Sequence, residues 1–512
     1  MAFTSIPFLF LFLPAVLAGF YLLRGPQLEA RRAWWLLAMS VAFYAASGAL
    51  NSLVLILSLG LNFFAARWLV GKSNGEEKKI RLAFAFVVTS NVALLLAFKY
   101  LAAESQGGGA YLISERILIP LGLSFITFQQ IAFLLDCKRG RVTSFSVRDY
   151  LLFITFFPQL VMGPIVHFRQ LSPQLRDGRL ATAFGANFSV GFAIFCVGLF
   201  KKVVLADSLS PSVDAVFGAA KSGESLHLLD AWFGAVAFQL QLFLDFSGYA
   251  DMAIGLAKMC NIDLPINFDR PLHAVSRFDL WRRWHITFVE FMRTHVFQPL
   301  ARISGMPLWV ALTITGMASG LWHGFGFTFL LWGGIQTALL LISHYWGRWR
   351  RNGWLKHIPR VTLIQIAITF GVTSLVGVMF RAESVSAAIL IFRGLIDFQN
   401  AALPIGILVL ADRIGLQLSS GQAPDLLIRM TDVFPLAGAA ITAWFLPQCR
   451  ELFVHYWTAP DPRQHRASTT AAPKHHWWQF RLNATWGLII GLLLITSLLL
   501  LGQAQRFVYY QF

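Results

Sequence analysis

Repeated apolar segments of about 20 residues are the feature that most limits how this chain folds. A segment of that length spans the hydrocarbon core of a bilayer as an α-helix. In lipid only helices and closed barrels satisfy their backbone hydrogen bonds, so we predict an all-α polytopic membrane protein. The candidate spans are residues 6–23, 33–48, 51–70, 82–101, 116–135, 186–205, 229–257, 308–345 (one long span or two pieces), 361–380, 434–456 and 484–501.

Composition and charge agree with a membrane protein. Of the 512 residues 56% are hydrophobic and 13% are charged, whereas soluble domains have about 25% charged residues. The net charge of +17 does not indicate nucleic acid, because the basic residues fall in short loops between apolar segments. The cysteines have neither disulfide nor zinc spacing, and no metal site is predicted. They are Cys137, Cys196, Cys260 and Cys449.

The basic loops also predict an orientation in the membrane. Lys and Arg cluster before the second span, between the third and fourth, and after the fifth, whereas the connections 48–51 and 102–114 have none. A periplasmic N-terminus with the basic loops in the cytoplasm satisfies all these connections. We therefore expect a multi-pass membrane protein, with one membrane domain over residues 1–512 and a polar loop at 457–482 before the last span.

Three further segments do not resemble simple crossings. Residues 150–166 are broken by two prolines and a glycine, which predicts a re-entrant element that forms part of a pocket wall. Residues 277–300 are too highly charged to face lipid, and with their aromatic residues they predict an amphipathic helix at the interface. Residues 401–411 form one more apolar segment.

One histidine, His323, lies in a long, otherwise uncharged apolar segment. Ionisable groups inside a membrane usually face a cavity or a pathway. Gly320, Gly324 and Gly326 allow backbone or substrate to approach the imidazole, and Trp322 supplies an apolar wall beside it. A neutral His323 would act as a general base, taking a proton from a hydroxyl as that oxygen attacks an acyl carbon. The competing interpretation is a packing histidine hydrogen-bonded to a neighbouring helix.

A second histidine, His285, lies in an aromatic and basic segment. At helical spacing its ring shares a face with those of two tryptophans and Phe288, and two arginines beside that face can reach phosphates or carboxylates. The segment predicts a site that orients a thioester or holds the phosphates of a nucleotide-like carrier; an interfacial Trp/Arg anchor is an equal alternative. The predicted binding residues are Trp281, Arg282, Arg283 and Trp284.

Two carboxylates, Asp245 and Asp251, fall within an apolar helix that also contains Tyr249. Buried carboxylates must be paired or protonated. Our preferred interpretation is a structural ion pair with one of the arginines at 270–283. A proton relay through Asp245, Asp251 and His323 is the alternative, and it would make the chain a transporter or flippase.

Several blocks in order resemble the membrane-bound O-acyltransferase superfamily, and in particular its bacterial alginate O-acetylase branch. The match is most specific around the two aspartates and continues through both histidine segments. The chain departs from the family between Thr287 and His295, at Ala301-Arg302 and at His167, which leaves the acceptor open. The matching blocks are Ile119 to Gln129, Met162 to Ile165, Asp245 to Gly255, Leu264 to Phe268, Phe278 to His285, Gly320 to Gly324 and Phe507 to Phe512.

The resemblance implies a location in the bacterial inner membrane, a fold and a reaction. The fold is a ring of about 11–12 transmembrane helices, with re-entrant and interfacial helices, around a central funnel. The reaction moves an acyl group from a cytoplasmic donor, here acetyl-CoA, to an acceptor on the far side, with no permanently bound cofactor. The acceptor is a periplasmic SGNH-type partner enzyme, a polysaccharide-export complex or a surface glycan. The implied catalytic residues are His323 and His285, and the implied pocket residues are Trp322, Asp245, Tyr249 and Asp251.

Overall fold

The structure, a computed structural model, is built from helices. It describes residues 2–23, 28–71, 77–107, 119–175, 180, 184–324, 326–352, 361–398, 427–457 and 476–503. The regular elements of these residues are all helical, which confirms the predicted all-α polytopic class. Six helical stretches among them are long and apolar enough to cross a membrane: Ala49–Val70, Glu77–Ala102, Gly185–Lys221, Leu228–Met259, Phe327–Arg350 and Thr362–Arg381.

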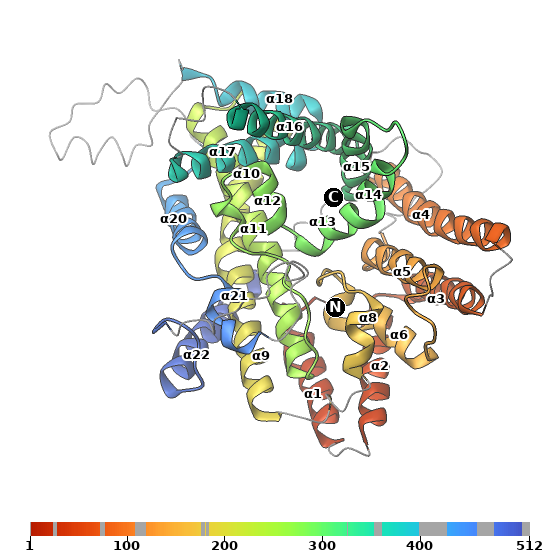
Figure 1. The fold of residues 1–512 in the computed structure, drawn as a ribbon. Helices are drawn as coiled ribbons and strands as arrows, with labels where there is room; N and C mark the ends of the chain where they lie inside the picture. Colours follow the sequence, from red (N-terminus) through yellow and green to blue (C-terminus); the bar gives the residue numbers. More distant parts are fainter. Residues whose placement is uncertain are drawn as a thin grey trace.

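The N-terminal helices pack as consecutive neighbours at one side of the molecule (Figure 1). The predicted break in 150–166 is present, because α6 ends at Thr155, α7 covers only four residues, and the chain that follows is irregular and buried. The elements are α1 (Leu13–Leu22), α2 (Glu29–Ala45), α3 (Ala49–Val70), α4 (Glu77–Gly107), α5 (Leu123–Lys138), α6 (Val147–Thr155), α7 (Phe157–Leu160) and α8 (Phe168–Leu171).

Two long helices, α9 (Phe184–Phe200) and α11 (Leu228–Met259), form the centre of the fold. They approach closely because glycines face each other. A Cβ added at Gly198 would lie 2.5 Å from the carbonyl oxygen of Gly248, and one added at Gly191 would lie 2.6 Å from that of Gly255. Such small-residue contacts let membrane helices pack backbone to backbone. A π-helical segment (Lys201–Ala206) and α10 (Ser210–Lys221) continue α9.

The C-terminal half changes two predicted spans. Residues 308–345 form two helices, α15 (Leu308–His323) and α16 (Phe327–Asn352), as one of the two alternatives had it. The predicted span 434–456 is wrong, because α20 (Met430–Trp444) ends before Pro447 and α21 (Cys449–Leu452) is separate. The remaining helices are α17 (Thr362–Arg381), α18 (Val385–Gly394) and α22 (Ala484–Leu499). Segment 401–411, most of the 457–482 loop and the 507–512 tail lie outside the described residues.

The single amphipathic helix predicted over 277–300 is also wrong. The segment forms α12 (Arg277–Arg283), α13 (Ile286–Met292), a π-helical turn (Arg293–Phe297) and α14 (Gln298–Ala301). It breaks at His285, whose φ of +43° is left-handed, a conformation that costs a non-glycine residue about 1–2 kcal/mol. Backbone hydrogen bonds from Asp269 to Arg283 and from Ile286 to Asn267 hold the preceding loop against the break and offset that cost.

The buried apolar residues form two clusters, and α11 contributes to both. One contains α1–α7 and α9, and the other contains α10, α17 and α18. The aromatic residues Phe288 and Trp322 belong to the first cluster, whereas Trp284, Trp332 and Phe380 belong to the second. Both predicted histidines lie where these aromatic residues meet.

Candidate active site

His323 is the last residue of α15, and close packing of α16 holds it there. A Cβ added at Gly316 would lie 2.8 Å from the carbonyl oxygen of Gly333 on α16, and Gly320 lies against the carbonyl of Phe329. Gly324 in turn contacts the Phe329 ring. The glycines at 320 and 324 therefore serve helix packing in this structure.

A cavity opens at His323 and contains both histidines. Its volume is about 50 Å³. One part of the wall is aromatic, and another is polar, formed by Gln239, Arg277, Gln336 and Thr373. The full lining is Gln239, Leu242, Arg277, Leu280, Trp281, Trp284, His285, Phe288, His323, Trp332, Gln336, Thr373, Gly377 and Phe380.

Aromatic rings surround the His323 imidazole. The rings of Trp332 and Phe380 meet it edge-on, with centroid distances of 5.1 and 4.9 Å, and Trp322 lies at 4.6 Å. Trp322 thus lies beside the imidazole as predicted, stacked on Phe288 at 4.4 Å, but it does not line the cavity. His323 is 8% exposed, so the imidazole is desolvated but reaches the cavity.

His285 is held in one orientation by a polar contact outside the cavity. Its Nδ1 lies 3.1 Å from Asn267 Oδ1, which also accepts hydrogen bonds from the Thr287 amide and hydroxyl. Because that oxygen is an acceptor, Nδ1 carries the proton and Nε2 keeps a lone pair. The Ile165 amide donates to the Thr287 hydroxyl oxygen at 2.9 Å. The irregular segment after α7 thereby supports His285 from behind, although it does not line the cavity.

Phe288 connects the two histidines. Its ring stacks on His285 at 4.9 Å and lies 6.0 Å from His323. The break at His285, rather than the predicted continuous helix face, brings Trp281, Trp284, His285 and Phe288 to one cavity.

Lys99 of α4 contacts the end of α15. Its Nζ donates a hydrogen bond of 3.1 Å to the carbonyl of His323, and the side chain is buried. The last carbonyls of a helix lack intrahelical donors, and a cation there is favourable. Lys99 therefore satisfies the backbone at the residue that presents the imidazole.

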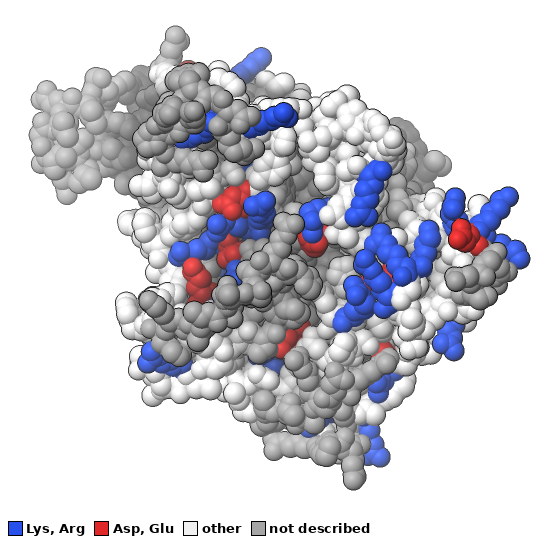
Figure 2. All heavy atoms as spheres, in the orientation of Figure 1, with Lys and Arg blue, Asp and Glu red and all other residues white. Residues whose placement is uncertain are grey.

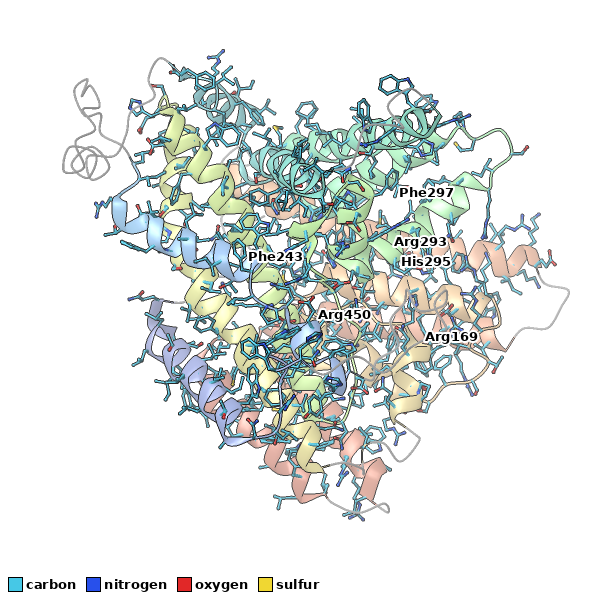
Figure 3. All side chains as sticks on the ribbon, turned by 60° about the vertical axis from the view of Figure 1, so that its left-hand side comes forward. Arg169, Phe243, Arg293, His295, Phe297 and Arg450 are labelled. Carbon is cyan, nitrogen blue, oxygen red and sulfur yellow. The ribbon has the colours of Figure 1, made fainter. Side chains whose placement is uncertain are left out.

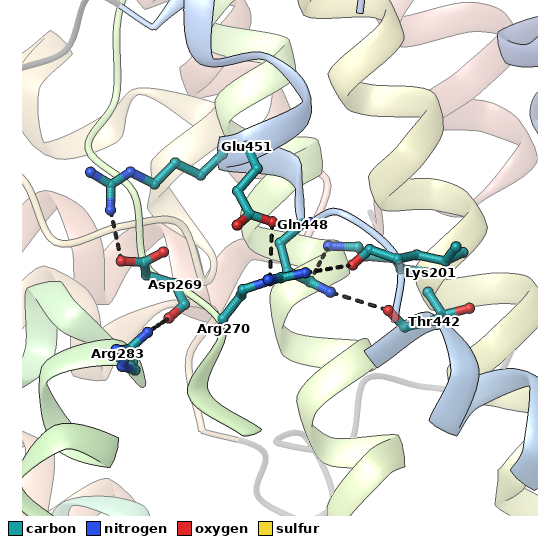
Figure 4. Close-up of polar contacts among 9 residues, drawn as sticks. Lys201, Asp269, Arg270, Arg283, Thr442, Gln448 and Glu451 are labelled. Atoms are coloured by element: carbon teal, nitrogen blue, oxygen red, sulfur yellow. Dashed lines mark hydrogen bonds and ion pairs between the residues drawn. The ribbon is translucent and has the colours of Figure 1, made fainter. Parts of the chain in front are cut away.

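The four predicted donor-binding residues separate into two pairs. Trp281 and Trp284 line the cavity, Arg282 is exposed, and Arg283 donates to Asp279 at 2.9 Å. Arg283 borders a surface network, because its guanidinium donates to the Asp269 carbonyl (Figure 4). The Asp269 carboxylate pairs with Arg450 at 2.7 Å.

The same network includes an ion pair between Arg270 and Glu451 at 3.0 Å. These contacts tie α21 to the loop before α12 and so help to place the start of α12.

The predicted arginine partners of the two aspartates are wrong, since both carboxylates pair with lysines. Lys201 Nζ lies 2.8 Å from Asp251, and Lys202 Nζ lies 2.8 Å from Asp245 and 2.5 Å from Asp207. The physical reason is the π-helical segment, which turns both lysines onto α11. Tyr249 stacks on Phe3 at 4.7 Å. Asp245, Tyr249 and Asp251 thus lie among helices and do not line the cavity.

A second polar region lies at the surface near α5, α8 and α13. Figure 2 shows Lys and Arg gathered there on the visible face, and Figure 3 shows Arg293 and His295 projecting from one short stretch. Arg141 and Arg169 share Asp136 at 3.4 Å each, and the rings of His167 and His295 lie 5.9 Å apart. We call Asp136, Arg141, His167, Arg169, Arg293 and His295 the basic cluster.

The polar cavity residues were not identified from the sequence, apart from the two histidines. Gln239, Gln336 and Thr373 lie inside apolar segments, and such polar residues within membrane helices are a usable signal. Arg277 was noted only as a charge that excludes a lipid-facing span. Lys99 lies near the end of an apolar segment, where it looks like a loop boundary.

Fold and site together define a polytopic membrane protein with two imidazoles in one interior cavity. Residues 36–381 match the model of the membrane-bound O-acyltransferase family, MBOAT. The chain belongs to this family.

Three relatives of the chain have names that refer to different polymers. The chain is 32% identical over 434 residues to the peptidoglycan O-acetyltransferase of Helicobacter pylori (77% of this chain, 80% of that protein). It is 31% identical over 437 residues to a probable alginate O-acetylase, AlgI, of Pseudomonas aeruginosa (80% of each). It is 24% identical over 267 residues to the teichoic acid D-alanyltransferase of Bacillus subtilis (50% and 67%). These matches support an O-acyltransferase and do not support the transporter alternative.

Proposed function

We propose that this chain is an inner-membrane O-acetyltransferase that takes acetyl from acetyl-CoA at the cytoplasmic face and passes it to a periplasmic acceptor. The acceptor belongs to exopolysaccharide modification of the alginate or cellulose type, and is either the glycan or an SGNH-type partner enzyme. One observation carries the proposal: the imidazoles of His285 and His323 line the same cavity in a chain that belongs to a family of O-acyltransferases.

His323 acts as the general base in this proposal. The acceptor hydroxyl gives its proton to the imidazole as its oxygen attacks the thioester carbon. The carbon–sulfur bond then breaks, and the imidazolium returns the proton to the departing thiolate. The products are an acetyl ester and free CoA. The lone pair on Nε2 of His285 accepts a hydrogen bond from a reacting group or from a water beside it.

The donor binds with its charged part outside the membrane. Moving only the acetyl group through the protein avoids carrying the phosphates of CoA across lipid. Arg282 and Arg283 are the proposed contacts for those phosphates, and Trp281 and Trp284 flank the thioester arm on its way to the cavity. Burial of His323 among rings keeps bulk water from the acyl group.

The test is acetyl transfer by a His323→Ala variant in membranes that retain normal amounts of the protein. We expect acetyl transfer from acetyl-CoA to polymer to fall by about 10²-fold or more, the usual contribution of a general base. His344→Ala is the matched control, because His344 is on α16 but does not line the cavity. Unchanged polymer acetylation by a stably inserted His323→Ala protein would refute the assignment.

A further inference from the structure

Arg277 places a guanidinium in the wall of the histidine cavity. It is the first residue of α12, whose start is capped by the Ser276 side chain. Arg277 is 5% exposed, and it lines the cavity together with His285 and His323. Nη1 donates to the Thr373 hydroxyl at 2.6 Å, and Nη2 donates to Gln336 Oε1.

Both partners of Arg277 are neutral. Among the residues that the structure describes, no carboxylate pairs with it. Asp279, the acidic residue nearest in sequence, is occupied by Arg283 and by the Val275 amide. Burial lowers the pKa of Arg277 to about 10, so the side chain stays charged at neutral pH. A buried charge without an opposite charge is strongly unfavourable. The folded protein therefore contains an energetically unfavourable buried charge that packing does not explain.

The free donors of Arg277 have the geometry that a carboxylate accepts. Its Nε–H is buried and has no hydrogen-bond partner among the described residues. A guanidinium has five N–H groups, of which Thr373 and Gln336 use one each. The Nε–H and an unused N–H on a terminal nitrogen form a two-pronged donor, which binds a carboxylate through two parallel hydrogen bonds.

We propose that Arg277 binds a carboxylate of the acceptor, so that the enzyme selects acidic sugars over neutral ones. This inference rests on the proposed function, because it requires the carboxyl group and a hydroxyl group of a glycan to reach the cavity of His323. The side-chain amides of Gln239 and Gln336 offer hydrogen bonds to sugar hydroxyls, and Trp281, Trp284 and Trp332 offer flat apolar faces.

A carboxylate fits this wall better than a phosphate of the donor does. Among the described residues, Arg277 is the only Lys or Arg that lines the cavity, and the phosphates of CoA together carry more negative charge than one guanidinium balances. Larger groups of basic residues are at the surface, as in the basic cluster. The carboxylate on Arg277 would hold the sugar while a neighbouring hydroxyl reaches His323.

The test compares two probes on full-length protein in lipid nanodiscs. One probe is a short oligouronate, and the other is the same oligosaccharide with its carboxyl groups reduced to alcohols. The variants are Arg277→Gln, which removes the charge, and Arg277→Lys, which keeps it. Arg302→Gln is the matched control, because Arg302 is exposed at the end of α14 and does not line the cavity.

Equilibrium binding measures the site without requiring acetyl transfer. We expect the wild type and Arg302→Gln to bind the acidic probe about tenfold or more tightly than the neutral one. Arg277→Gln should lose this preference, and Arg277→Lys should retain part of it. Equal binding of both probes by the wild type, or an unchanged preference in Arg277→Gln, overturns the inference. A loss of CoA binding alone in Arg277→Gln also overturns it, because the anion would then be the donor's.

Acetyl transfer to the same probes separates this inference from the proposed function. If the wild type binds the acidic probe through Arg277 but does not acetylate it with acetyl-CoA, the carboxylate site stands and the proposed function fails. If both probes are acetylated equally and Arg277 has no effect on binding, the proposed function stands and the carboxylate site fails.

Discussion

Two regions of this molecule that contain buried cations differ in how those charges are compensated. In the layer between α9, its π-helical continuation and α11, lysines and aspartates pair at 2.5–2.8 Å; we call Lys201, Lys202, Asp207, Asp245 and Asp251 the lysine–aspartate layer. By contrast, Arg277 in the cavity wall and Lys99 at the end of α15 bond only to neutral oxygens among the described residues.

The difference separates charges that hold helices together from charges that can act on a ligand. A buried ion pair satisfies both members and leaves nothing for a substrate. A cation held by neutral acceptors keeps its field and can still pair with an incoming group. The lysine–aspartate layer is therefore structural in our interpretation, whereas Arg277 can act on a ligand and Lys99 positions His323.

Breaking the lysine–aspartate layer should have the largest effect on stability. Lys202→Met leaves Asp207 and Asp245 without their cation, and removing one partner of a buried pair costs about 3–5 kcal/mol. We expect little folded protein, measured by size-exclusion profile and thermal unfolding in detergent. Lys221→Met is the control, because its pair with Glu383 is on the surface and is worth at most about 1 kcal/mol. A folded but inactive Lys202→Met protein would contradict the structural role.

Removing Lys99 should affect the reaction more than the fold. Lys99→Met takes away the donor to the His323 carbonyl, so the end of α15 and its imidazole lose a fixed position. Small displacements of a catalytic group cost up to about 10²-fold in rate. We expect kcat to fall about tenfold with little change in KM, and Lys99→Arg to recover part of it.

Thermal unfolding measured alongside decides the interpretation of Lys99. A large loss of stability in Lys99→Met with normal turnover would place Lys99 with the structural charges. That result would leave Arg277 as the one of these two cations with a functional role.

The basic cluster should show the smallest effect, and one that depends on pH. Burial, the neighbouring His167 and nearby arginines lower the pKa of His295 to about 4. Its ordinary value is 6.5, so the unfolded chain takes up a proton at a higher pH than the folded protein does. Stability from the neutral ring is present above pH 6.5 and is lost as the pH falls from 6.5 towards 4. His295→Gln should flatten that part of a plot of unfolding temperature against pH. An equally steep fall in the variant would assign the loss to other groups.

The sequence was informative where one segment determines its own environment. Length and apolarity predicted the all-α membrane class, two prolines and a glycine predicted the break in 150–166, and isolation in an apolar segment singled out His323. The pattern over 277–300 was misleading, because helical periodicity continues through His285 while contacts with Asn267 bend the chain there.

Pairing between distant segments could not be inferred in the same way. Asp245 and Asp251 were assigned to arginines close in sequence, yet their partners are Lys201 and Lys202 across a glycine-lined helix contact. The roles of Arg277 and Lys99 were not predicted. The neighbouring sequence does not distinguish a cation that lines a cavity or binds a helix end from one at a loop boundary.

The amino-acid pattern was thus enough to establish a helical protein for lipid and to select the two histidines, because hydrophobicity and desolvation act on each segment separately. Which charges are compensated and which remain exposed to a ligand was decided by tertiary packing alone. Coulomb and hydrogen-bond energies depend on distances between residues such as Arg277, Gln336 and Thr373, and those distances exist only once α12, α16 and α17 have packed together.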